Sequence, residues 1–193
     1  MADRWAFLVA IEKFADPALG GVPYADGCAK ALADALASSG YRRSHQVVLT
    51  GSHATRTAVE SRLRKLKRLV KKGDELLAVW VGRGFAHAGT GVLPCWDTLP
   101  DDLADTSLTV KELVETLSGT KASQVAVLLD VGAGADAPGP AGDGWEAFLD
   151  PDELDRLFAD SPKLVGVRSC DADERSHSAG GLKATAWCHL VAE

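Results

Sequence analysis

Thiol chemistry is the first possibility that the residue types raise, because the 193-residue chain contains four cysteines and five histidines. A thiolate attacks a carbonyl carbon when an adjacent imidazole takes and then returns the proton, so a Cys and a His must lie within hydrogen-bond reach. For Cys28, Cys95 and Cys188 we expect small apolar filler in the core. Cys170 follows a short apolar run and has the better position for exposure. The chemistry therefore depends on where the fold places these residues.

Composition and charge limit the classes of protein. Hydrophobic residues make up 46% and charged residues 25% of the chain, which indicates one soluble globular domain over residues 1–193, on its own or as a module of a longer protein. No apolar run approaches the roughly 20 residues that cross a bilayer, and a net charge of -6 argues against nucleic acid. Without a CxxC pair or a signal peptide, we expect a reduced cytoplasmic protein with no metal and no cofactor.

Apolar runs with strand character alternate with amphipathic segments along the chain. The expected strands are 5–11, 46–50, 75–81, 124–129 and 163–168. The expected helices are 26–39, 54–72, 110–117, one that begins at Pro151, and 182–192. Thr55 or Thr57 is the expected N-cap of the helix 54–72. This alternation predicts an α/β fold with a mainly parallel sheet of about five to six strands, covered on both faces. Sites in such sheets lie at the carboxyl ends of the strands, here after Ile11, Val81, Leu129 and Arg168. A polar, glycine-rich loop is expected after Val81.

Short motifs mark these strand ends and helix starts in a fixed order. They are Ile11–Phe14, Ala25–Gly27, Ala54–Arg56, Val81–Gly84, Leu93–Asp97 and Asp130–Ala135. Their order and separation resemble those of the caspase-like cysteine peptidases of the metacaspase and bacterial orthocaspase type (peptidase C14), over nearly the whole chain. The resemblance implies a caspase-like α/β/α sandwich.

Two of these motifs correspond to the catalytic motifs of that family, and both lack the catalytic residue. Val81–Gly84 stands where the family has Ser-Gly-His-Gly, so Arg83 replaces the general base. Asp130–Ala135 stands where the family has Asp-x-Cys-His-Ser-Gly, so Gly132 replaces the nucleophile. Glycine offers no nucleophile, and arginine is not deprotonated in proteins. The resemblance therefore implies a pseudo-protease with a degenerate dyad at Arg83 and Gly132.

The family's pocket for a substrate Arg or Lys is matched in part. Asp26 and Asp130 stand at the positions of its two carboxylates, and Val81 replaces a serine. Two carboxylates facing one cavity would attract a cation. Two arrangements of Arg83 remain open: it pairs with Asp130 or Asp26 and plugs the pocket, or it is a solvated loop residue while Asp26 favours the start of its helix through the dipole.

The first functional hypothesis is a binding, scaffolding or regulatory module of a bacterial signalling or defence system, with a protein partner or active homologue and no nucleic acid or membrane. The second is an unorthodox cysteine endopeptidase that cleaves after basic residues, with a relocated dyad drawn from His87, Cys95 and Cys170. The third is a nucleotide-binding or methyl-donor-binding enzyme built on the loop after Gly132. Pro138–Pro140 opposes it, because such a loop must lead into a helix.

One charged feature lies outside these motifs. The expected helix 54–72 carries seven basic residues on its polar face, namely Arg62, Arg64, Lys65, Lys67, Arg68, Lys71 and Lys72. Such a face could meet an acidic partner or nucleic acid. In a chain of net charge -6 we expect a solvated helix face.

Overall fold

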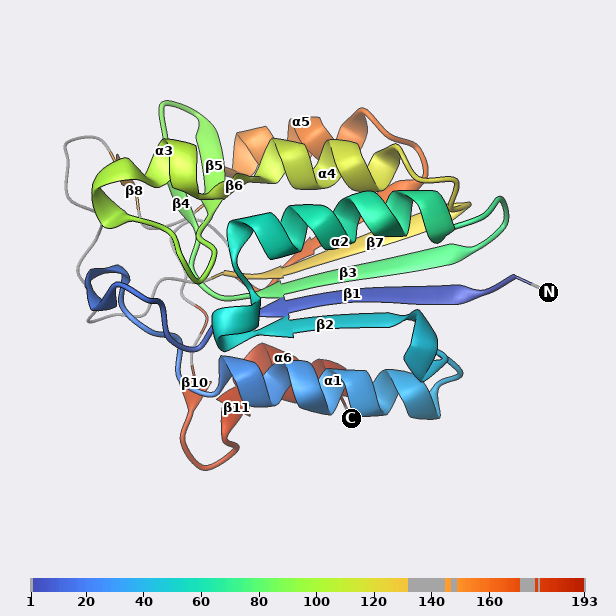
Figure 1. The fold of residues 1–193 in the computed structure, drawn as a ribbon, viewed down its shortest axis with the longest axis horizontal. Coiled ribbons are helices and arrows are strands. Elements are labelled where there is room, and N and C mark those ends of the chain that lie inside the picture. The colour runs from blue at the N-terminus through green and yellow to red at the C-terminus, as the bar shows by residue number, and fades with distance from the viewer. Residues whose placement is uncertain (1, 132–144, 147–148, 171–175, 177, 193) are drawn as a thin grey trace.

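A parallel sheet forms the centre of the computed structural model, which describes residues 2–131, 145–146, 149–170, 176 and 178–192 (Figure 1). Its strands are β1 (Arg4–Ala10), β2 (Gln46–Thr50), β3 (Glu75–Val81), β7 (Gln124–Asp130) and β9 (Leu164–Arg168). They are arranged in the order β2-β1-β3-β7-β9, and all neighbours are parallel. The predicted α/β class and the predicted strands are confirmed.

Helices cover both faces of this sheet (Figure 1). One face carries α2 (Arg56–Leu69), α4 (Val110–Ser118) and α5 (Pro151–Ala159), and the other carries α1 (Ala25–Ser38) and α6 (Ala186–Ala192). β3 is almost entirely apolar because a strand between two helical layers is buried on both sides.

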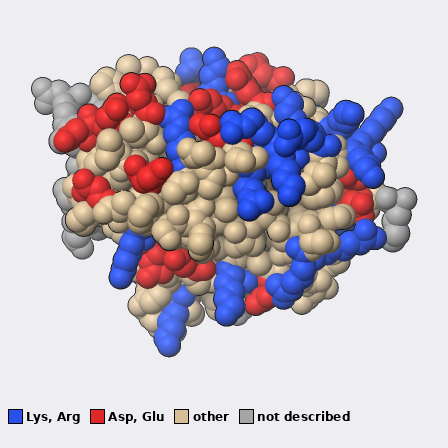
Figure 2. Space-filling model, viewed as in Figure 1, with Lys and Arg blue, Asp and Glu red and all other residues tan. Residues whose placement is uncertain are grey.

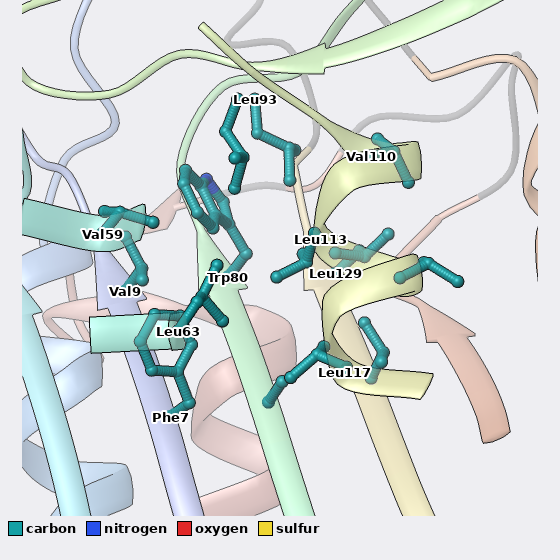
Figure 3. Close-up of a cluster of buried hydrophobic side chains, with 14 of the residues drawn as sticks. Phe7, Val9, Val59, Leu63, Trp80, Leu93, Val110, Leu113, Leu117 and Leu129 are labelled. Carbon is teal, nitrogen blue, oxygen red and sulfur yellow. The ribbon is translucent and has the colours of Figure 1, made fainter. Parts of the chain in front are cut away.

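Each layer has its own hydrophobic core. On the α2 and α4 side, Trp80 of β3 and Leu129 of β7 pack with Leu63, Val110 and Leu113 (Figure 3). The layer of α1 and α6 packs smaller side chains, which include those of Cys28, Leu32, Val79, Val81 and Cys188.

A small antiparallel sheet occupies the region where the sequence predicted a polar loop. It consists of β4 (Phe85–His87), β5 (Thr90–Leu93), β6 (Leu108–Thr109) and β8 (Trp145–Glu146), in the order β6-β5-β4-β8. Ala88 and Gly89 join β4 to β5 with φ values of 49° and 75°. A two-residue loop with positive φ at both positions is typical of a type I′ hairpin. The usual sequence signal for this turn is Asn, Asp or Gly at the first position, and here that residue is Ala88.

Two helix boundaries differ from the prediction. α2 begins after its N-cap Thr55, as one of the two expected candidates, but it ends at Leu69 because Val70 is extended and the Asp74 carboxylate accepts the N–H of Lys71 at 2.9 Å. α6 begins at Ala186 instead of residue 182, because β11 (Ala184–Thr185) pairs antiparallel with β10 (Ser178–Ala179).

The remaining elements are short. They are α3 (Leu103–Thr106) and the 3-10 helices η1 (Pro17–Leu19), η2 (Arg43–His45), η3 (Gly51–His53) and η4 (Pro100–Asp102). In the described part of the chain, every helix is too short or too polar to cross a bilayer. Charge is unevenly spread, since Lys and Arg gather over α2 on the face that Figure 2 shows.

Candidate functional site

The carboxyl ends of β1, β3 and β7 lie side by side, as expected for the site of a parallel sheet. Val81 of β3 is the register partner of Asp130 of β7. The N–H of Ile11 donates to the carbonyl of Val81 at 3.0 Å, and the N–H of Gly82 donates to the carbonyl of Asp130 at 3.0 Å. The motifs at 81–84 and 130–135 are therefore adjacent in space where they begin. Gly132 itself, and the loop proposed for nucleotide binding, lie outside the described residues.

Arg83 is buried immediately beyond the end of β3 and has no exposed surface. Its guanidinium carbon lies 5.1 Å from the centre of the Phe85 ring. Within the described ranges, none of its three guanidinium nitrogens has a hydrogen-bond partner. Burial lowers the pKa of this arginine from its usual value. Both expected arrangements are corrected: Arg83 is not solvated, and it makes no hydrogen bond to Asp130 or Asp26.

Asp130 is buried, and side-chain donors from the C-terminal part of the chain surround its carboxylate. Ser176 Oγ donates to Oδ1, Thr185 Oγ1 donates to Oδ2 at 2.5 Å, and the Cys188 thiol lies 3.5 Å from Oδ2. Both oxygens are thus occupied by donors of the chain itself. No sequence signal indicated Ser176 or Thr185 as partners of Asp130, because neither belongs to a motif and both are far from Asp130 along the chain.

Cys28 and Cys188 adjoin Asp130 in the core between α1 and α6. The N–H of Thr185 donates to Cys28 Sγ at 3.3 Å, and Thr185 Oγ1 accepts the N–H of Cys188 at 3.1 Å. The interaction between the two thiols lowers the pKa of Cys28 and, together with burial, raises the pKa of Cys188. Their expected burial is confirmed, and neither thiol is exposed to a substrate.

Asp26 and Val81 have local structural roles. Asp26 lies in the first turn of α1, and its Oδ1 accepts the N–H of Glu12 at 3.2 Å, which holds the connection between β1 and α1. Val81 is buried in the core on the α1 side. Among the residues that the structure describes, no hydrogen bond or ion pair links Asp26 to Asp130.

The candidates for a relocated dyad lie in different surroundings. Cys95 is fully buried in the core, and burial raises the pKa of its thiol to about 12, so it is protonated at neutral pH. His87 is exposed at the end of β4 beside a hollow of about 450 Å³ that Pro100, Leu103 and Thr109 also line. Cys170 is half-buried just after β9, and its sulfur lies 3.8 Å from Ser169 Oγ. In the described residues, no group of three or more His, Cys, Asp or Glu side chains could hold a metal ion.

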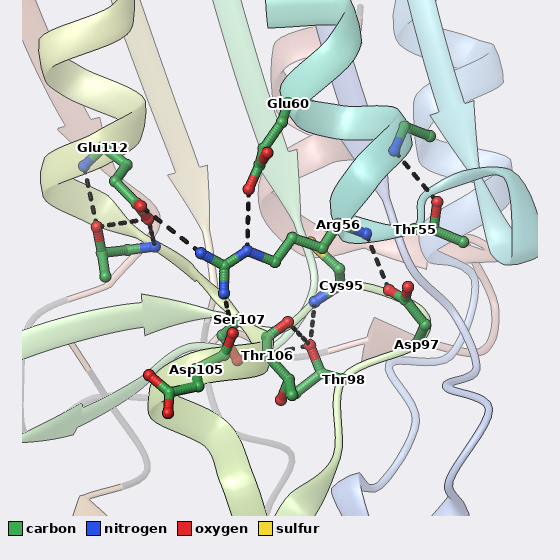
Figure 4. Close-up of polar contacts among 12 residues, drawn as sticks. Thr55, Arg56, Glu60, Cys95, Asp97, Thr98, Asp105, Thr106, Ser107 and Glu112 are labelled. Atoms are coloured by element: carbon green, nitrogen blue, oxygen red, sulfur yellow. Dashed lines mark hydrogen bonds and ion pairs between the residues drawn. The ribbon is translucent and has the colours of Figure 1, made fainter.

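The motifs around Arg56 and Asp97 form a structural network that the sequence did not reveal (Figure 4). Asp97 Oδ1 accepts the N–H of Arg56 at 2.8 Å, at the first turn of α2. The Arg56 guanidinium lies 3.0 Å from Glu60 and 3.6 Å from Glu112, and it donates to the carbonyl of Asp105. These contacts join α2 to α4, to α3 and to the segment that contains Asp97. The two motifs are therefore explained by packing and not by catalysis.

Comparisons with known proteins depend on structure alone, since neither a protein-family model nor a curated protein matches the sequence. The crystal structure of protein GSU0716 from Geobacter sulfurreducens aligns with a TM-score of 0.68 at 15% identity, over 96% of this chain and 79% of that one. Caspase-1 from Spodoptera frugiperda aligns with a TM-score of 0.57 at 13% identity, over 95% of this chain and 65% of that one. The chain has a caspase-like fold. The similarity establishes the fold that the motifs implied. In this fold, Arg83 and Asp130 lie at the ends of the neighbouring strands β3 and β7.

Proposed function

We propose that this chain is a caspase-like domain without peptidase activity, which serves as a binding, scaffolding or regulatory module. Its partner would be an active homologue or another subunit of a bacterial signalling or defence system. The observation that carries this proposal is the buried Arg83 at the position that the family resemblance assigns to the general base. A guanidinium keeps its proton and cannot accept one from a thiol. The position assigned to the nucleophile is Gly132, which has no side chain to react.

The state of Arg83 also supports a class of ligand. A buried cation without a counter-charge is destabilising, and a carboxylate or phosphate that forms paired hydrogen bonds with the guanidinium would remove that cost. The Asp130 carboxylate already accepts hydrogen bonds from Ser176 and Thr185, so a pocket for a basic side chain has less support. We therefore infer that the partner presents an anionic group. Because Arg83 has no exposed surface, the chain around it must open before that group can bind.

The alternative functions have less support. An unorthodox endopeptidase specific for basic residues would need a thiolate, and Cys95 lies in the core with its pKa raised to about 12. Cys170 is the more accessible candidate nucleophile. A nucleotide-binding or methyl-donor-binding enzyme would depend on the loop after Gly132, and nothing in the described residues supports it.

Fluorogenic peptides with Arg or Lys before the reporter group test the absence of peptidase activity, with and without calcium. We expect no turnover above that of a heat-inactivated sample. Turnover that disappears in Cys170→Ala or Cys95→Ala would overturn the proposal, because it would identify a working thiol.

Binding is tested by fluorescence anisotropy with labelled peptides that differ only in one Glu, Gln or Lys. We expect the Glu peptide to bind most tightly and to lose its advantage in Arg83→Met, while Lys30→Met, a change at an exposed cation of α1, retains it. Preferential binding of the Lys peptide that is lost in Asp26→Asn would contradict an anionic partner and favour the acidic pocket.

A further inference from the structure

Two patches of opposite charge lie on the molecular face that α2 occupies (Figure 2). The basic patch consists of seven exposed side chains, Arg62, Arg64, Lys65, Lys67, Arg68, Lys71 and Lys72. The acidic patch consists of four exposed side chains, Asp97, Asp101, Asp102 and Asp105. The contact between Asp97 and the first turn of α2 places the acidic patch at the start of this helix. The basic patch covers its second half and the residues just after it.

Other described residues compensate few of the charges in either patch. In the basic patch, Arg64 pairs with Glu60 at 3.2 Å. No other ion pair between described residues involves either patch at 4 Å or less. Most of these charges are therefore available to an external surface.

Helix stability explains only part of this arrangement. Lys67 and Arg68 lie in the last turn of α2, where cations are favoured by the helix dipole. Arg62, Arg64 and Lys65 lie earlier, and like charges three or four residues apart on a helix, such as Lys65 and Arg68, destabilise it. In the acidic patch, the Asp97 carboxylate accepts a hydrogen bond from α2, and Asp105 accepts one through its backbone carbonyl, which leaves its carboxylate available.

We propose that this face binds a second copy of the same chain across a two-fold axis. In such an isologous contact each surface meets itself in reverse. The two-fold axis would lie in the plane of the contact, perpendicular to the line that joins the acidic patch to the basic patch. Rotation about this axis places each basic patch over the partner's acidic patch. The ion pairs that the single chain lacks are then formed twice.

Apolar contacts support this arrangement at both ends. Leu69 is 42% exposed within the basic patch, and Leu99 is 53% exposed within the acidic patch. The same rotation brings each Leu69 toward the partner's Leu99. An interface needs such apolar contacts, because exposed ion pairs alone contribute little to affinity.

The combination of patches argues against a nucleic acid as the occupant of this face. A polyanion that crossed the basic patch would meet the acidic patch at the other end of α2. The helix also carries no aromatic side chain on which a base could stack. A better partner is a surface whose acidic patch faces this basic patch and whose basic patch faces this acidic patch. A second copy of the chain has such a surface.

Sedimentation equilibrium of the full chain tests the proposal through its dependence on salt and charge. We expect a monomer–dimer equilibrium at low salt that shifts to monomer at high salt, because the screening length falls from about 30 Å at 0.01 M to about 3 Å at 1 M. The basic-reversed variant combines Arg62→Glu, Lys65→Glu, Arg68→Glu, Lys71→Glu and Lys72→Glu, which makes the basic patch net acidic. The acid-reversed variant combines Asp101→Lys, Asp102→Lys and Asp105→Lys, which makes the acidic patch net basic. Each variant alone should be monomeric where the wild type dimerises.

Mixing the two variants provides the decisive result. One chain then has acidic charge at both patches and the other has basic charge at both, so we expect a one-to-one heterodimer and no homodimer of either. Lys30→Glu on the exposed side of α1 is the matched control and should dimerise like the wild type. A wild type that is monomeric at low salt would overturn the proposal. A dimer that persists in both charge-reversed variants would also overturn it. A dimer that is lost in Val165→Lys would overturn it as well, because that result would place the contact at the exposed edge strand β9.

Discussion

Arg83 determines what the site can do, because it combines a permanent charge with burial at the end of β3. Its guanidinium carbon lies 5.1 Å from the centre of the Phe85 ring, and among the described residues its nitrogens have no hydrogen-bond partner. A catalytic histidine in this place would need a nucleophile within reach. Under the proposed function, an arginine in this place binds an anionic group.

Replacement of Arg83 tests whether its charge lacks a partner. We expect Arg83→Met to raise the free energy of unfolding by about 1–4 kcal/mol in urea denaturation, because a hydrophobic side chain of similar length removes a buried charge that has no partner among the described residues. Arg62→Met, at an exposed position, should change it by less than about 0.5 kcal/mol. Destabilisation of the Arg83 variant by several kcal/mol would show that the folded chain already contains a counter-charge for it.

At the scale of the elements, the start and end of α2 are set by two polar side chains. Thr55 accepts the N–H of Ala58 at 3.2 Å and caps the first turn. Asp74 accepts hydrogen bonds from the N–H groups of Asp3 and Lys71 and from the indole of Trp5 at 3.0 Å. These contacts position α2 over β1 and β3, and with it the network around Arg56.

The Thr55 cap of α2 leads to a prediction for which Thr57, two residues away, is the control. Thr55→Ala should lower the free energy of unfolding by about 1 kcal/mol, because the Ala58 N–H loses its acceptor. Thr57→Ala alters an exposed threonine that is not the cap, and we expect no loss there. Chemical denaturation of the two variants side by side measures the difference. Equal losses would contradict the assignment of Thr55 as the cap.

Asp74 makes stability depend on acid. Burial opposes ionisation of its carboxyl, but hydrogen bonds from Lys71, Asp3 and Trp5 outweigh it and hold the pKa below the ordinary value. A carboxyl whose folded pKa is depressed contributes stability above its unfolded pKa of about 3.9 and loses it as pH falls through the folded pKa. Asp74→Asn should therefore lower the free energy of unfolding at neutral pH. Between about pH 5 and pH 2, the free energy of unfolding of this variant should fall less steeply than that of the wild type. An unchanged slope, equal to that of exposed Asp105→Asn, would contradict this role.

The limits of sequence analysis are visible at this same scale. The strand 75–81 is recognisable because burial on both faces requires a continuous apolar run. The hairpin of β4 and β5 was missed because Ala88, with φ of 49°, gives no turn signal. The motifs located the strand ends of the site correctly. They could not indicate that Thr185 satisfies Asp130, because that contact joins residues 55 positions apart.

For the whole molecule, a caspase-like fold and the chemistry of a caspase are separable properties. The parallel sheet requires apolar strands and helices that cover it, and residues such as Leu63, Trp80 and Leu129 provide the core. Catalysis would require two further side chains at strand ends, and loss of those side chains leaves the core intact. The charged face of α2 is a third property, independent of both, and it concerns association and not chemistry.

The central claim is that this fold is retained without peptidase activity, and one measurement tests it most directly. The full chain is incubated with a library of peptides derived from a digested proteome, and new peptide termini are identified by mass spectrometry. A double variant with Cys95→Ala and Cys170→Ala serves as the blank. We predict identical sets of termini in both samples. Termini that appear only with the unmodified chain and share a residue before the cleaved bond would contradict the claim.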